Sequence, residues 1–261
     1  MPNAMQIARS GLEALDARLR TISNNLANAQ TVGFKRDRAA FETLMYATTR
    51  PAGAPAGADN RFGMGLSTGS GVRVAGTERV QAQGSATITS NALDLMIEGE
   101  GFFEVTMPDG TSAFTRAGAF TRDSEGRVVT PQGYQIVPGI QIPENATDIT
   151  IGPDGTVSAM MPGETTPTEV GRLTLTTFIN PAGLEPNGEN LFRESAASGA
   201  PQQGNPGENG VGTLRQGALE ASNVSAVQEL VDMIETQRAY EINSKVIKAS
   251  DEMMQYANQT V

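Results

Sequence analysis

Apolar side chains near the start of the chain recur at the spacing of one face of a helix. Between residues 5 and 28 the gaps between them alternate between four and three positions, which predicts a helix with a narrow heptad seam. Asn and Gly residues follow, so the helix is expected to end near residue 28 and to lead into a turn at 31–34. The seam consists of Ala8, Leu12, Leu15, Leu19, Ile22 and Leu26.

A longer apolar stripe lies at the other end of the chain. Ser225, followed three positions later by Gln228, fits a capping box at its start. No Gly or Pro interrupts residues 224–261, so the pattern predicts a helix of about 35 residues. The stripe slips by one position near its middle, and it runs through Val224, Val227, Val231, Ile234, Ile242, Val246, Ala249, Met253 and Tyr256.

Two arrangements would cover these narrow seams. The helices either pair within one chain and cap a globular domain, or they form a coiled-coil-like layer shared between neighbouring chains. Charge fits pairing of the ends, because residues 1–44 hold six basic and four acidic side chains and residues 222–261 hold three and six. The second arrangement predicts the following subunit-packing residues: Leu12, Leu15, Leu19, Ile22, Leu26, Val227, Val231, Ile234, Ile242, Val246 and Met253.

The middle of the chain follows a different pattern. Residues 47–60 lack periodicity and are rich in Ala, Gly and Pro, a composition typical of a flexible linker. From residue 72 onward, short alternating segments are separated by turns such as 108–110, 124–126 and 153–155. Their spacing of roughly 10 residues predicts β-hairpins in a small barrel or folded sheet.

The predicted fold class is therefore α+β, with an all-β middle domain inserted between two long terminal helices. Aromatic residues make up only 5% of the chain and Trp is absent, which argues against one large core. The predicted division is 1–44 for the N-terminal helix and turn, 45–71 for an extended tongue or linker, 72–221 for the β-rich domain and 222–261 for the C-terminal helix.

Composition excludes most familiar chemistry. The chain contains no Cys and no His, which removes thiolate zinc sites, cysteine nucleophiles and histidine-based triads. No nucleotide-binding glycine loop occurs, and a net charge of −10 argues against binding nucleic acid. We therefore predict no catalytic, cofactor-binding or metal-binding residue and no cofactor.

Several acidic residues have simpler interpretations than catalysis or metal binding. Asp109, Asp123 and Asp154 lie near glycines and are expected to bond the backbone of their own turns. Glu98, Glu100 and Glu104 are expected to form a solvated strand face. No run approaches 18 apolar residues, and the start of the chain lacks the pattern of a cleaved signal peptide. These features predict a chain that stays in the cytosol or leaves it without a cleaved signal.

Separated motifs resemble those of one protein family. SNNLAN at 23–28 and TVGFKR at 31–36 resemble the N-terminal signature of the flagellar rod and hook proteins. GEGFF at 99–103 and RAGAFT at 116–121 resemble the first hairpin of their shared β domain. QRAYEINSK at 237–245 is similar to their C-terminal signature. Chain length and the segments at 46–68 and 198–224 favour the distal rod branch of this family.

The resemblance implies a non-enzymatic structural subunit. The terminal helices would form the inner layer of a rigid helical tube around an export channel, and the tube would transmit torque from motor to hook. The implied partners are further copies of the chain, proximal rod and hook proteins at the two ends, and surrounding ring or bushing proteins, with no nucleic acid and no membrane insertion. The implied location is the basal-body rod across the periplasm, reached by type III export.

The resemblance also implies behaviour of particular segments. Residues 46–68 would form a tongue wedged against adjacent subunits that stiffens the rod, and the terminal helices would be largely disordered before assembly. The alternatives are a hook or proximal-rod subunit, in which the tongue would be mobile, and a monomeric carboxylate-dependent cell-wall enzyme, which would need a deep cleft with perturbed carboxylates.

Overall fold

The computed structural model describes residues 2–55, 60–163 and 166–259. The chain divides into two packing units that each contain distant stretches of sequence. The helix–arm unit comprises 1–27, 37–78 and 225–261, and the β unit comprises 28–36 and 79–224. The predicted four-part division of the chain follows other limits and stays a prediction.

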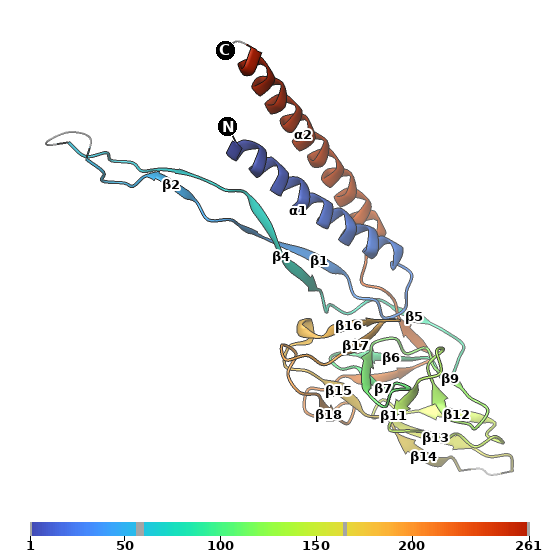
Figure 1. Cartoon of the computed structure of the whole chain (residues 1–261). Coiled ribbons are helices and arrows are strands. Elements are labelled where there is room, and N and C mark those ends of the chain that lie inside the picture. Colours follow the sequence, from blue (N-terminus) through green and yellow to red (C-terminus); the bar gives the residue numbers. More distant parts are fainter. Residues whose placement is uncertain (1, 56–59, 164–165, 260–261) are drawn as a thin grey trace. The chain divides into compact units, whose positions relative to one another are not determined.

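Two long helices pack together in the helix–arm unit. Helix α1 spans Pro2–Ala27 and helix α2 spans Ala226–Gln259. They run antiparallel, so that the two chain ends lie at the same end of the pair (Figure 1). Both helices follow the predicted limits closely. The Ser225 hydroxyl accepts the Gln228 N–H at 3.5 Å, as expected for the first half of a capping box.

A two-stranded arm extends beside the helices in the same unit (Figure 1). Strand β1 (Asp37–Thr43) pairs with β4 (Val72–Arg79), and β2 (Ala47–Arg50) pairs with β3 (Leu66–Thr68). The register places Ala47 opposite Thr68. The linker interpretation was therefore wrong for residues 47–50. Ala47 and Thr48 pair across the ribbon with Thr68 and Ser67, about twenty residues further along, which composition alone does not show.

The β unit is built from short antiparallel strands. Seven of them form one curled sheet in the order β16-β17-β8-β7-β11-β10-β9, and three others form the sheet β12-β13-β14. The strands of the unit are β5 (Ala86–Ile88), β6 (Leu95–Glu98), β7 (Phe103–Thr106), β8 (Ser112–Thr115), β9 (Thr121–Arg122), β10 (Val128–Val129), β11 (Gln135–Val137), β12 (Asp148–Ile151), β13 (Thr156–Met160), β14 (Thr168–Arg172), β15 (Leu175–Thr177), β16 (Glu185–Gly188), β17 (Leu191–Arg193), β18 (Gln202–Gly204), β19 (Thr213–Gln216) and β20 (Ala218–Glu220).

The core of the β unit is apolar and includes side chains of the neighbouring strands β7 and β8. Phe103 is fully buried and meets Phe120 edge-on at 5.0 Å between ring centroids. Phe114 meets Phe178 edge-on at 4.8 Å, a preferred geometry for aromatic pairs. A short 3₁₀ helix, η1 (Pro181–Gly183), lies in the same unit. The predicted α+β class, with paired terminal helices around an inserted β region, is confirmed.

Candidate assembly site

The base of the helix pair is joined by polar side chains. Asn25 of α1 and Glu229 of α2 are each only 1% exposed, and the Asn25 amide donates to Glu229 Oε2 at 3.2 Å. The same amide donates to the Asp37 carbonyl at 2.8 Å, while its oxygen accepts the Asp37 N–H at 2.9 Å. Asn25 therefore connects α1, α2 and the start of β1.

The predicted packing residues of α1 lie partly inside the helix–arm unit. Ile22 is buried at 4% exposure. Leu12, Leu15, Leu19 and Leu26 are half-buried. This seam is thus covered in part by the chain itself.

The predicted packing residues of α2 are exposed instead. Their exposed fractions lie between 45% and 73%, so a large part of each side chain in this apolar stripe lies in water. The structure does not bring this α2 set against the α1 set, and a role of either set in subunit packing stays a prediction. The α2 stripe consists of Val227, Val231, Ile234, Ile242, Val246 and Met253.

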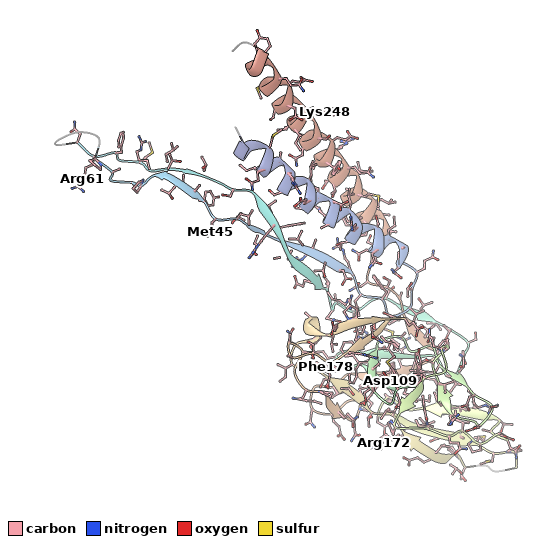
Figure 2. All side chains as sticks on the ribbon, in the orientation of Figure 1. Met45, Arg61, Asp109, Arg172, Phe178 and Lys248 are labelled. Carbon is pink, nitrogen blue, oxygen red and sulfur yellow. The ribbon has the colours of Figure 1, made fainter. Side chains whose placement is uncertain are left out.

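The arm carries further exposed apolar side chains. Met45 is 87% exposed and Met64 is 81% exposed, and Figure 2 shows Met45 and Arg61 along this ribbon. Phe41, Tyr46 and Leu66 are also exposed. A two-stranded ribbon is only marginally stable alone in water, so an exposed apolar ribbon is typical of a surface that packs against other molecules.

An ion cluster, defined here as Lys35, Arg116 and Glu220, is buried in the β unit. Glu220 is 1% exposed; its Oε1 accepts from Lys35 Nζ at 2.6 Å and its Oε2 accepts from Arg116 Nε at 3.0 Å. Lys35 also donates to the Ala82 carbonyl at 2.8 Å. Arg116 donates to the carbonyls of Gly99 and Gly101 at 2.9 and 2.6 Å.

The electrostatics of the cluster keep Glu220 ionised. Burial alone would raise the pKa of Glu220, but the Arg116 charge and the hydrogen bonds from Lys35 and the Gly84 N–H hold that pKa below its ordinary value. Burial lowers the pKa of Lys35, and its bond to Glu220 offsets this only in part. Breaking such a pair by removing one partner leaves a buried charge without compensation.

Backbone bonds reinforce the same junction. The Gly33 N–H donates to the Glu220 carbonyl at 2.7 Å, and the Arg36 N–H donates to Asn223 Oδ1 at 2.7 Å. The stretch that follows α1 is therefore paired, inside the β unit, with the stretch that precedes α2. The motifs TVGFKR and RAGAFT each contribute one member of the ion cluster. Both motifs can be recognised in the sequence, but their shared contact with Glu220 cannot.

The acidic residues of the turns follow expectation. Asp109 accepts the Thr111 N–H at 3.0 Å, Asp123 accepts the Arg127 N–H at 2.8 Å, and Asp154 accepts the Thr156 N–H at 3.3 Å. Hydrogen bonds from the Thr111 hydroxyl, the Arg127 side chain and the Thr156 hydroxyl, respectively, hold the pKa of each carboxyl below its ordinary value. The turn prediction is confirmed for all three.

The expected solvated face is wrong for one of its three members. Glu98 and Glu100 are exposed, but Glu104 is buried. It accepts hydrogen bonds from Ser112 at 2.7 Å and Gln203 at 2.6 Å. Ser112 lies on β8, the partner of β7 in the predicted hairpin, but Gln203 lies on β18, 99 positions from Glu104, and local alternation does not place that strand beside β7. The buried carboxylate is thus part of a structural hydrogen-bond network.

Within residues 2–55, 60–163 and 166–259, no cluster of three or more acidic, His or Cys side chains is arranged to hold a metal ion. Among the helices in this described part of the chain, none is sufficiently long and apolar to cross a membrane.

Comparisons with known proteins agree along the chain. Residues 5–35 match the family model for flagella basal body rod proteins, residues 96–159 match the FlgE/F/G D1 domain of flagellar hook proteins, and residues 215–260 match the C-terminal region of FlgEFG rod proteins. The chain is 48% identical to the flagellar basal-body rod protein FlgG of Buchnera aphidicola subsp. Acyrthosiphon pisum over 98% of both chains. It is 46% identical to FlgG of Caulobacter vibrioides over 98% of both chains. The identity to FlgF of that bacterium is 34%, over 98% of this chain and 97% of FlgF.

Proposed function

The chain belongs to the family of flagellar basal-body rod proteins FlgG, and on that premise we propose that it polymerises into the distal rod. In this proposal it forms a rigid helical tube that encloses the export channel and transmits torque to the hook. Further copies of the chain are its main partners. Proximal rod and hook proteins contact the two ends of the tube, and ring proteins surround it. The higher identity to FlgG than to FlgF of one bacterium supports the distal rod over a proximal position.

The exposed apolar stripe of α2 is the observation that carries this proposal. Six apolar side chains of one helix lie in water while Glu229 and Thr236 are buried on the same helix. Covering the exposed part of such a side chain contributes about 1–2 kcal/mol. A stripe on one copy that packs against a different surface of the next copy gives a heterologous contact, and such contacts generate open helical filaments.

Hydrogen exchange on the purified chain tests the proposal. In dilute monomer, amides of residues 2–27 and 226–259 are expected to exchange rapidly around a protected β unit, because the packing of these helices is incomplete without neighbours. On assembly, exchange of both helices is expected to slow by at least about tenfold. Full protection of both helices in a verified monomer, unchanged at assembling concentrations, would contradict the proposal and favour a self-contained globular protein.

Shortening the arm is expected to soften the polymer without preventing its formation. The Leu44 N–H donates to the Gly71 carbonyl at 3.0 Å and Ala47 lies opposite Thr68, so an Asn-Gly turn in place of residues 47–68 joins the opposed residues Tyr46 and Gly69 with little strain. The variant retains the α2 stripe but loses the exposed apolar tip of the arm. We expect filaments with a shorter persistence length, measured by electron microscopy. Arg61→Ala in the full-length arm is the control, and unchanged stiffness of the shortened variant would refute the role of the arm.

A further inference from the structure

The register of the helix pair can be read from two contacts. Asn25 of α1 bonds Glu229 of α2, and a side chain added at Gly11 would lie 3.3 Å from the Asn243 amide nitrogen. Each pair of residue numbers has the same sum, 254 (25 + 229 and 11 + 243), as an antiparallel pair with a constant register requires. Both pairs also lie a whole number of heptads apart along each helix, so one continuous face of α2 meets α1.

The central line of that inner face of α2 is polar, and the half-buried side chains of Met233, Ala239 and Ile247 flank it. The positions seven residues apart that include the two contacts are Glu229, Thr236, Asn243 and Ser250. Glu229 and Thr236 are each 1% exposed. Successive residues of an α-helix are rotated by about 100°, so Val227 lies about 200° from Glu229 and Ile234 about 200° from Thr236. The first half of the apolar stripe therefore points almost directly away from α1.

This orientation is opposite to the usual one. An amphipathic helix ordinarily turns its apolar face toward its neighbour, and α1 presents half-buried leucines along its length. A rotation of α2 by about half a turn would bring Val227, Val231 and Ile234 to the face of α1 that carries Gly11 and Asn25, which Leu15 and Ile22 flank. Some interaction must oppose this rotation for the observed arrangement to persist.

We propose that the pair Asn25–Glu229 is a rotational lock that keeps the polar face of α2 inward. Two bonds with the Asp37 backbone fix the Asn25 amide, which leaves one N–H to be satisfied in a buried position. Glu229 supplies the acceptor. Rotation of α2 would remove the carboxylate and leave that donor buried without a partner, which opposes the rotation. The consequence for assembly, an apolar stripe held outward for the next copy, rests on the proposed function; the lock itself is a property of the single chain.

Disulfide trapping in dilute, monomeric chain tests the lock. The chain has no cysteine, so engineered pairs are unambiguous. Gly11→Cys with Asn243→Cys reports the observed face, and Gly11→Cys with Glu241→Cys reports the face about 200° away. A disulfide forms whenever the two cysteines come into contact, so the experiment also detects helix pairing that is transient. With Glu229 present, the 11–243 disulfide is expected to predominate.

Three variants give the lock a distinct signature. Glu229→Lys offers donors only, so the ratio of the 11–243 to the 11–241 disulfide is expected to fall by roughly tenfold. Glu229→Gln keeps an acceptor and should keep the ratio. The double variant Asn25→Asp/Glu229→Lys restores a complementary pair across the helices but loses the N–H that Asn25 donates to the Asp37 carbonyl, so it should return the ratio part of the way to its original value, which a merely structural defect would not do. Glu235→Lys, the same substitution at an exposed position of α2, is the matched control.

The lock is overturned if Glu229→Lys leaves the ratio unchanged, or if the double variant fails to restore it even in part. Circular dichroism of each variant verifies that the helices still form; should Glu229→Lys alone lose helix content, recovery of both helix content and the ratio in the double variant remains the deciding result. Because no step requires polymer, failure of the lock leaves the proposed function standing, and failure to assemble leaves the lock untouched.

Discussion

Replacing Glu220 by leucine is expected to lower the free energy of unfolding of the β unit by about 3–5 kcal/mol. The substitution leaves the Lys35 ammonium and the Arg116 guanidinium buried without their shared anion. The loss should appear as faster hydrogen exchange of β-unit amides under native conditions. Adding Lys35→Met to Glu220→Leu should recover part of the loss, because it removes one of the two uncompensated charges.

A matched control separates buried charge from charge in general. Glu98 pairs with Arg215 at 3.2 Å, and both side chains are 47% exposed. Glu98→Gln is therefore expected to cost less than about 1 kcal/mol. If Glu98→Gln and Glu220→Gln lower the free energy of unfolding equally, burial of the ion cluster does not increase its contribution to stability.

The cluster also predicts a dependence of stability on pH. The pKa of Glu220 is lower in the folded chain than its ordinary value of 4.5. The stability that it contributes is thus fully present above pH 4.5 and is lost as the pH falls below that value, through the folded pKa. The Glu220→Gln variant should lack this component of the acid sensitivity.

Substituting the α2 stripe is expected to abolish assembly while leaving the single chain folded. Ile234 and Ile242 are 51% and 62% exposed, so Ile234→Asp/Ile242→Asp should change the stability of the monomer by only a few tenths of a kcal/mol. If neighbours cover the exposed part of both side chains, about 2–3 kcal/mol of burial is lost per subunit. The critical concentration for polymerisation should then rise at least about tenfold, measured by sedimentation.

The control for this experiment carries the same added charge on the same helix. Gln237→Asp/Gln255→Asp introduces two carboxylates at exposed polar positions of α2 and should polymerise nearly as well as the unmodified chain. Normal polymerisation of the stripe variant would show that Ile234 and Ile242 do not take part in subunit packing. Equal inhibition by both variants would attribute the effect to charge instead.

Local periodicity predicted the elements of this fold well. The heptad seams gave both helices to within a few residues, and Asp109, Asp123 and Asp154 marked hairpin turns because their bonds reach only two to four positions along the chain. Hydrogen bonds between residues so close in the sequence can be predicted from the local residue pattern. The α+β class follows from them directly.

Interactions between distant residues escaped the same reasoning. Glu220 lies 185 positions from Lys35 and 104 from Arg116, and each of the three looks like an ordinary surface charge in its own segment. The inner face of α2 was missed for a related reason. Glu229, Thr236 and Asn243 recur at heptad spacing, but a line of polar residues on a helix is typical of a face in water, and only the position of α1 shows otherwise.

The ion cluster also imposes an order in time. Synthesis runs from the N-terminus, so Lys35 and Arg116 exist long before their common anion at position 220 is made. Until then, burying the two cations would cost free energy that no anion offsets, so the strands around them are not expected to pack over them. The β unit therefore completes only after about five-sixths of the chain has emerged. A chain whose core is completed by residues made late in synthesis is expected to stay incompletely folded until its synthesis is nearly finished.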